Sequence, residues 1–164
     1  MLESVEPLEM LESRVLEDAA ATENLGAQLA KAAIPPLVIY LQGELGAGKT
    51  TLVRGFLRGL GYTGTVKSPT FTLVEEYAFE EKSEFVYHFD LYRLNDPEAL
   101  EFMGIREYLQ DQALVLIEWP EQGEHYLPKP DVILQLESAN AARSIKVMFF
   151  TERSLGLKKA FEIL

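Results

Sequence analysis

The chain has 164 residues, 48% of them hydrophobic and 25% charged, which is enough to bury one core and predicts a single domain. It has no cysteine, which excludes disulfides and thiolate chemistry, and it shows neither an apolar stretch of membrane-spanning length nor a basic, apolar leader, so we expect a cytoplasmic protein without a membrane span. The formal net charge of -11 argues against tight binding of RNA by this chain alone, because lysines and arginines supply most of that affinity.

The acidic start of the chain, residues 1–13, contains a proline and predicts a flexible lead-in. The domain is then expected to run over residues 14–164. A short strand is predicted at residues 14–17. A helix follows over residues 22–33, because Thr22 can cap its first turn and apolar side chains recur on one face.

A phosphate-binding loop follows the next predicted strand, the apolar run of residues 37–41. Residues 43–50 read GELGAGKT, which matches the pattern G-x-x-x-x-G-K-[ST]. The glycines let the backbone curl so that several amides point at one spot, where phosphate oxygens can bind. Lys49 then reaches the outer phosphates, and the Thr50 hydroxyl is placed to ligate a magnesium ion. The predicted helix over residues 51–60 adds the positive end of its dipole.

The rest of the chain predicts a mixed sheet with short helices between its strands. In chain order the predicted elements are strands at 73–77 and 85–90, short helices at 96–101 and 107–111, strands at 113–117, 131–137 and 144–150, and an amphipathic helix at the end. The nearly continuous apolar character of residues 113–117 indicates a strand buried on both faces. We therefore predict a three-layer α/β domain, NTPase-like around its phosphate loop, with a mixed and partly antiparallel sheet.

Two carboxylates each end a predicted hydrophobic strand. Asp90 ends residues 85–89 and Glu118 ends residues 114–117. In phosphate-loop enzymes a magnesium ligand usually comes from such a strand end. Glu118 has the more completely buried strand behind it, so we favour it as the metal ligand, direct or through water. Asp90 is then free to orient the attacking water or to act as the base.

Other candidate residues admit two interpretations. Ser68 and Thr70 flank Pro69 and form either a switch segment that meets a terminal phosphate or an ordinary turn before a strand. His88 is either a core histidine or a catalytic one. Trp119 either packs in the core or stacks near the nucleotide.

The basic residues form two groups along the sequence. Lys49, Arg54, Arg58 and Lys67 flank the loop, where nucleotide phosphates explain them. The second group is expected to be solvated surface rather than a docking patch for an acidic partner. It comprises Arg143, Lys146, Arg153, Lys158 and Lys159.

Several blocks of the sequence, taken together, resemble one bacterial family. Besides the phosphate loop they are VKSPTFTLVE at 66–75, YHFDLYRL at 87–94, LEFMGIR at 100–106 and IEWP at 117–120. They resemble TsaE, the small ATPase of the system that modifies tRNA with threonylcarbamoyladenosine. The resemblance extends over about residues 22–130 and is more specific than the phosphate loop alone.

The resemblance implies an Mg²⁺-dependent ATPase that supports transfer of a threonylcarbamoyl group to the adenosine beside the anticodon, in tRNAs that read codons starting with A. The transfer itself belongs to TsaD, paired with TsaB. The chain is expected to dock on that pair and to reset it by hydrolysing ATP, so its contact with tRNA is indirect.

The resemblance also implies roles for individual residues of this sequence. Thr50 and Glu118 ligate magnesium, Asp90 is needed for hydrolysis together with Lys49, and the segment containing Ser68 and Thr70 is switch-like. The expected nucleotide contacts are Leu45, Gly46, Ala47, Gly48, Lys49, Thr50, Thr51, Trp119 and Thr22.

Two other classes of nucleotide-binding protein remain as alternatives. A small-molecule kinase uses the same loop, but it needs an acceptor pocket and an arginine-bearing lid, for which Arg93 and Arg106 are weak candidates. A guanine-nucleotide switch normally carries D-x-x-G after the loop, which is missing here. Its guanine-reading K-x-D occurs only at residues 129–131, without the preceding Asn or Thr.

Overall fold

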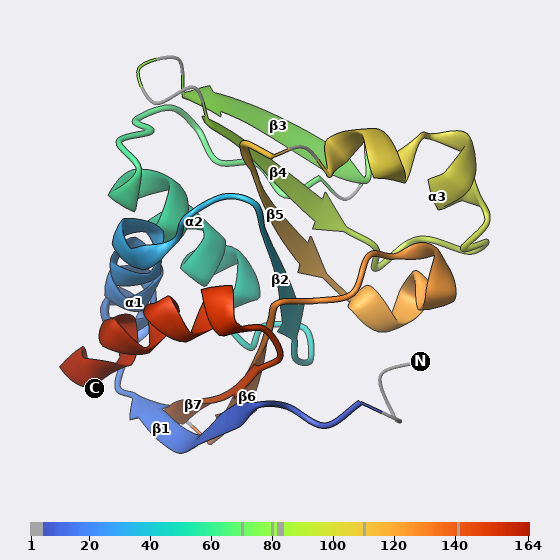
Figure 1. Ribbon diagram of the computed structural model, residues 1–164. Coiled ribbons are helices and arrows are strands. Elements are labelled where there is room, and N and C mark those ends of the chain that lie inside the picture. Colours follow the sequence, from blue (N-terminus) through green and yellow to red (C-terminus); the bar gives the residue numbers. More distant parts are fainter. Residues whose placement is uncertain (1–4, 70, 80, 82–83, 110, 141) are drawn as a thin grey trace.

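A seven-stranded sheet forms the centre of the computed structural model (Figure 1). The structure describes residues 5–164 except 70, 80, 82–83, 110 and 141. The strand order is β1-β7-β6-β2-β5-β4-β3. The strands are β1 (Glu9–Leu16), β2 (Leu37–Gln42), β3 (Val74–Phe79), β4 (Glu84–Asp90), β5 (Ala113–Glu118), β6 (Val132–Ala139) and β7 (Ala142–Phe149).

The central strands are parallel and the outer ones antiparallel. β2 pairs in parallel with β5 and β6, and β4 pairs in parallel with β5. β3, β7 and β1 join as antiparallel partners of β4, β6 and β7. Every residue of β5 is buried, as expected for a strand inside a parallel sheet that is covered on both faces. The predicted mixed α/β sheet is thereby confirmed.

Helices cover both faces of the sheet and make the predicted three layers (Figure 1). One face carries α1 (Ala19–Ala32), α2 (Lys49–Gly59) and the 3₁₀ helix η6 (Glu152–Ile163). The other carries α3 (Ala99–Phe102) and the 3₁₀ turns η3 (Ile105–Tyr108), η4 (Pro120–Gln122) and η5 (Glu124–Tyr126). None of the helices in the described part of the chain has the length and apolarity to cross a bilayer.

Alternation along the strands divides the interior into two cores. On β5, Leu114 and Leu116 pack in the core beneath α1 and α2, whereas Val115 and Ile117 pack in the core beneath α3. This is the period of two that sends successive side chains of a strand to opposite faces. The strand ends are therefore held from both sides, which makes the edge of the sheet a rigid platform.

The two long helices touch through glycines. A Cβ atom on Gly55 of α2 would lie 1.9 Å from the carbonyl oxygen of Glu23, and one on Gly26 of α1 would lie 2.2 Å from the carbonyl oxygen of Leu52. Both distances are far below van der Waals contact, so only glycine allows this approach. The contact holds α2 against α1 and thereby fixes the direction in which the first turn of α2 points.

Several predicted boundaries were wrong. β1 begins at Glu9 and pairs with β7, so residues 9–13 belong to the sheet and not to a flexible lead-in. α1 begins at Ala19, because the Asp18 carboxylate accepts from the amide of Ala21 at 2.8 Å and acts as the cap in place of Thr22. The C-terminal helix is 3₁₀, and Ser154, Leu157 and Ala160 are buried at its period of three.

We predict that Gly55→Ala lowers the free energy of unfolding by about 1–3 kcal/mol, the usual cost of overpacking, even though alanine gains about 1 kcal/mol of helix propensity over glycine. Urea denaturation measures this change. Gly156→Ala in η6 is the matched control, because no other described part of the chain lies within 4 Å of its added Cβ beyond its chain neighbours and its own helix backbone. It should shift stability by less than about 0.5 kcal/mol. Equal stabilities for the two variants would contradict the close helix contact.

Candidate nucleotide site

The predicted phosphate loop connects β2 to α2 and has the backbone geometry of an anion cradle. Gly46 and Gly48 have φ angles of 80° and 108°, in the left-handed region that side chains other than glycine rarely adopt. Gly48 is the N-cap of α2, and no side chain of the described residues caps that helix end. The amides of the first turn of α2 are thus left for another acceptor, which is the arrangement that binds phosphate.

Both candidate carboxylates stand beside this loop because of strand register. Glu118 pairs with Leu41 of β2 on one side and with Asp90 of β4 on the other. Parallel strands place their carboxyl ends at one edge of the sheet, where ligands of α/β proteins bind. Asp90 and Glu118 are 7% and 2% exposed, so each carboxylate is largely removed from water.

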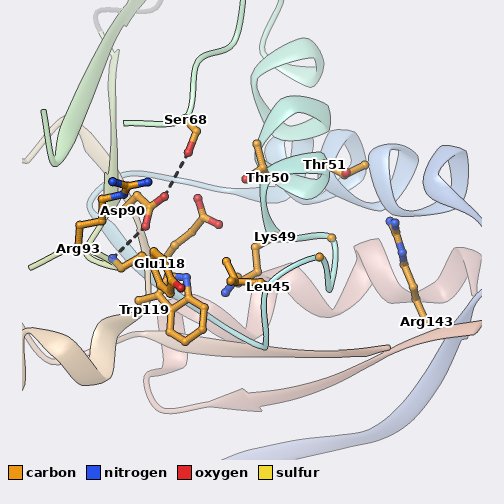
Figure 2. A pocket seen from close by; sticks show the side chains of 13 residues that line it. Leu45, Lys49, Thr50, Thr51, Ser68, Asp90, Arg93, Glu118, Trp119 and Arg143 are labelled. Atoms are coloured by element: carbon orange, nitrogen blue, oxygen red, sulfur yellow. Dashed lines mark hydrogen bonds between the residues drawn. The ribbon is translucent and has the colours of Figure 1, made fainter. Parts of the chain in front are cut away.

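One cavity of about 570 Å³ joins the loop to these carboxylates (Figure 2). A volume of this size suits a small-molecule ligand. Most of the predicted site residues line it: Leu45, Gly46, Gly48, Lys49, Thr50, Thr51, Ser68, Asp90, Glu118 and Trp119.

Some predicted residues lie elsewhere. Thr22 is fully buried inside α1, where its hydroxyl donates to the carbonyl of Asp18 at 3.3 Å, and it does not line the cavity. The side chain of Ala47 is also buried and outside the lining. Thr70 lies outside the described residues. The structure therefore gives Thr22 no place in the pocket.

Lys49 is buried between the loop and Trp119. Its Nζ donates to the carbonyl of Gly43 and lies 3.7 Å from the centroid of the Trp119 ring. Burial lowers the pKa of Lys49, and the charge of Glu118 is the largest of the carboxylate effects that oppose this shift. The pocket thus holds a desolvated amine within the field of several carboxylates, a setting in which charge acts strongly on a ligand.

The carboxylates differ in how the protein holds them. Asp90 has both oxygens engaged, since Ser68 Oγ donates to Oδ2 at 3.2 Å and the amide of Tyr92 donates to Oδ1 at 3.1 Å (Figure 2). For Glu118, Oε2 lies 2.7 Å from Nε2 of His88. The predicted switch segment therefore contacts Asp90 directly, through Ser68.

Arg143 is the main lining residue that the sequence analysis missed. It belongs to β7 and approaches the loop from the side opposite Asp90 and Glu118 (Figure 2). A Cβ on Gly48 would lie 3.1 Å from its Nη1, and that nitrogen is buried without a hydrogen-bond partner among the described residues. The prediction of solvated surface is wrong for Arg143.

The sequence carries no local signal for Arg143. Its position depends on the hairpin in which Ser138 of β6 pairs with Arg143, and that register brings the chain back beside the loop. Two other residues of the same basic group have structural partners instead. Arg153 pairs with Asp131 at 3.1 Å, and Lys158 pairs with Glu9. Tyr92 and Arg93 also line the cavity.

The donor set fits magnesium that is shared with phosphate. Among the residues that the structure describes, no group of three or more histidines or carboxylates could hold a metal by itself. Mg²⁺ usually takes one or two carboxylates and completes its octahedron with phosphate oxygens and water. Thr50, Asp90 and Glu118 offer oxygen ligands of this kind within one cavity.

Together the fold and the cavity define a phosphate-loop NTPase-like domain. The model of the family described as threonylcarbamoyl adenosine biosynthesis protein TsaE matches residues 16–145. The chain therefore belongs to the TsaE family, as the sequence blocks had predicted.

Similar proteins cover most of the chain. The tRNA threonylcarbamoyladenosine biosynthesis protein TsaE of Haemophilus influenzae is 50% identical over 125 residues, which are 76% of this chain and 78% of that protein. The TsaE protein of Bacillus subtilis is 40% identical over 123 residues, 75% and 73% of the two chains. The crystal structure of Bacillus subtilis YdiB is similar with a TM-score of 0.77 at 29% identity, covering 94% of this chain and 95% of that chain.

Proposed function

We propose that this chain is an Mg²⁺-dependent ATPase of the cytoplasm that supports threonylcarbamoyladenosine formation in tRNA. The observation that carries the proposal is the cavity in which the glycine loop, Lys49 and Thr50 face the register-paired carboxylates Asp90 and Glu118. Membership of the TsaE family supports the role in tRNA modification.

The loop and its flanking cations would bind the triphosphate. Backbone amides at the start of α2 donate to phosphate oxygens, and Lys49 leaves the Gly43 carbonyl to reach the outer phosphates. Arg143 supplies donors from the other side of the loop, where its buried Nη1 has no partner within the described ranges of the chain. A buried guanidinium nitrogen without an acceptor is costly in a folded protein, and a nucleotide oxygen would satisfy it.

The two carboxylates have different proposed roles, Glu118 in metal binding and Asp90 in hydrolysis. Thr50 and Glu118 would hold Mg²⁺, which when bound neutralises charge on the phosphate oxygens. The protein engages only Oε2 of Glu118 in the described hydrogen bonds, and this leaves Oε1 for a metal. Asp90, held at both oxygens by Ser68 and Tyr92, is fixed in orientation and suits the alignment of an attacking water.

The proposed function also requires partner proteins, which carry out the transfer to tRNA. We place this chain with the TsaD and TsaB pair, which carries out the transfer to the adenosine beside the anticodon in tRNAs that read codons starting with A. The net charge of -11 supports contact with tRNA through that pair and not by this chain alone.

The function is tested by a pull-down of the chain with the TsaD and TsaB pair in ATP and Mg²⁺, with ATP consumption followed in parallel. We expect retention on the pair, ATP hydrolysis without an added acceptor, and weak binding of isolated tRNA at physiological salt. Consumption that requires a small-molecule acceptor would instead indicate a kinase. A preference for GTP over ATP would indicate a guanine-nucleotide switch.

Lys49→Ala should weaken ATP binding by about 10- to 100-fold, because a hydrogen bond to a charged group contributes about 1.5–3 kcal/mol. Equilibrium dialysis with labelled ATP measures the affinity. Lys31→Ala is the control, since Lys31 lies in the last turn of α1 and outside the cavity lining. Equal affinities for both variants would remove Lys49 from the site.

Glu118→Gln and Asp90→Asn should separate metal binding from hydrolysis. The Glu118 variant should lose at least about tenfold in Mg²⁺-dependent ATP affinity, because it removes a charged ligand. The Asp90 variant should bind ATP almost normally and hydrolyse it about 10²- to 10⁴-fold more slowly, the usual contribution of a positioned base. Dialysis and phosphate-release assays measure the two effects, and the reverse pattern would exchange the assignments.

Arg143→Met should reduce ATP affinity by about tenfold, which corresponds to about 1.4 kcal/mol. Lys146→Met on the same strand removes the same charge outside the cavity lining and should change affinity by less than about twofold. If both variants lose affinity equally, Arg143 acts only through overall charge and does not contact the nucleotide.

A further inference from the structure

His88 lies directly behind the proposed metal ligand. It is on β4, two residues before Asp90, and its side chain is fully buried. Its Nε2 is 2.7 Å from Oε2 of Glu118 on the neighbouring strand β5. Glu118 lines the cavity and His88 does not, so the imidazole contacts the carboxylate from the core side.

The chemistry of the pair determines which group donates. A carboxylate oxygen can only accept, so the hydrogen bond requires a proton on Nε2 of His88. The other ring nitrogen, Nδ1, is buried and has no hydrogen-bond partner in the part of the chain that the structure describes. A leucine or phenylalanine would fill this position without an unsatisfied nitrogen, so packing alone does not account for a histidine here.

Glu118 needs such a restraint because a cation lies nearby. Its charge has the largest carboxylate effect on the pKa of Lys49, yet in the described part of the chain Glu118 makes its close contact with His88, and no salt bridge joins it to Lys49. A carboxylate free to rotate would be drawn to the amine of Lys49. The hydrogen bond to His88 opposes this movement.

We propose that His88 is a positioning residue for the metal site. Its Nε2–H holds Oε2 of Glu118 on the core side, and the other oxygen of the carboxylate is kept for Mg²⁺ in the cavity. This inference rests on the proposed function, since it assumes that Glu118 ligates the metal. Hydrogen-bond partners of metal ligands typically change metal affinity 10- to 100-fold when they are removed.

The test measures ADP affinity by calorimetry at increasing Mg²⁺ concentrations. The quantity compared between variants is the Mg²⁺ concentration at which half of the metal-dependent increase in ADP affinity is reached. His88→Phe removes the donor and keeps an aromatic ring, and it should raise that concentration about 10- to 100-fold. ADP affinity in EDTA should stay within about twofold. His88→Gln can place an amide N–H near the position of Nε2 and should restore the Mg²⁺ requirement to within a few-fold of wild type.

His88→Asn is the matched control for polarity, because its shorter amide reaches the position of Nδ1 and not that of Nε2. Its Mg²⁺ requirement should be raised as in the Phe variant. If the Phe variant does not fold, the difference in Mg²⁺ requirement between the Gln and Asn variants tests the proposal. Ser154→Ala, which removes the hydrogen bond from the buried Ser154 hydroxyl to the carbonyl of Thr151, corrects for general loss of stability and should leave the Mg²⁺ requirement unchanged. An unchanged requirement in His88→Phe, or equal damage in Gln and Asn, would overturn the proposal.

Glu118→Gln in the same assay separates the two levels of inference. If it raises the Mg²⁺ requirement and His88→Phe does not, the positioning role fails while the proposed metal ligand stands. If Glu118→Gln has no effect, the metal assignment fails and the role of His88 fails with it.

A measurement without metal adds an independent readout. The chain has only two histidines, so ¹⁵N spectra of the imidazole side chains are simple to assign with a His125→Gln variant. We expect the Nε2–H form for His88. An Nδ1–H form would place a lone pair against the Glu118 carboxylate and would contradict the proposal.

Discussion

The whole site depends on the parallel pairing of three strands, because it brings their carboxyl ends to one edge of the sheet. Glu118 at the end of β5 is in register with Leu41 of β2 and with Asp90 of β4. The phosphate loop continues directly from β2, so this strand places the cradle, and the next two strands along the sheet, β5 and β4, each place a carboxylate beside it. Burying carboxylates is unfavourable unless donors satisfy them. Ser68, the Tyr92 amide and His88 supply those donors here.

The rest of the fold keeps this edge rigid. α2 must begin where the loop ends, and its direction is set by the glycine contact with α1. The two cores pack against opposite faces of β5, so the strand end that carries Glu118 has little freedom to move. Preorganised donors and ligands of this kind lower the cost of ordering a bound nucleotide. To reach a bound phosphate, Lys49 would have to change its contacts, since its amine lies against the Gly43 carbonyl and the Trp119 ring.

Local patterns in the sequence were enough to predict the loop, the strands beside it and the cavity residues that they carry. The glycine spacing in residues 43–50 predicts the backbone conformation of the loop, and the apolar run before Glu118 predicts a buried strand. Features that depend on distant pairing could not be predicted in this way. Arg143 reaches the loop through the register of β6 with β7. His88 contacts Glu118 because β4 and β5 are adjacent in the sheet. The start of α1 was predicted wrongly because Asp18, and not Thr22, caps the helix. The start of β1 was predicted wrongly because residues from Glu9 onward pair with β7, which is distant in the sequence.

Calorimetric titration of the purified chain with ATP in excess Mg²⁺ shows whether the loop and its cavity bind a nucleotide, because it measures the binding itself and needs neither partner nor turnover. We expect a saturable heat with ATP that weakens when Mg²⁺ is removed. The absence of heat with ATP, and with every other purine triphosphate, would contradict it.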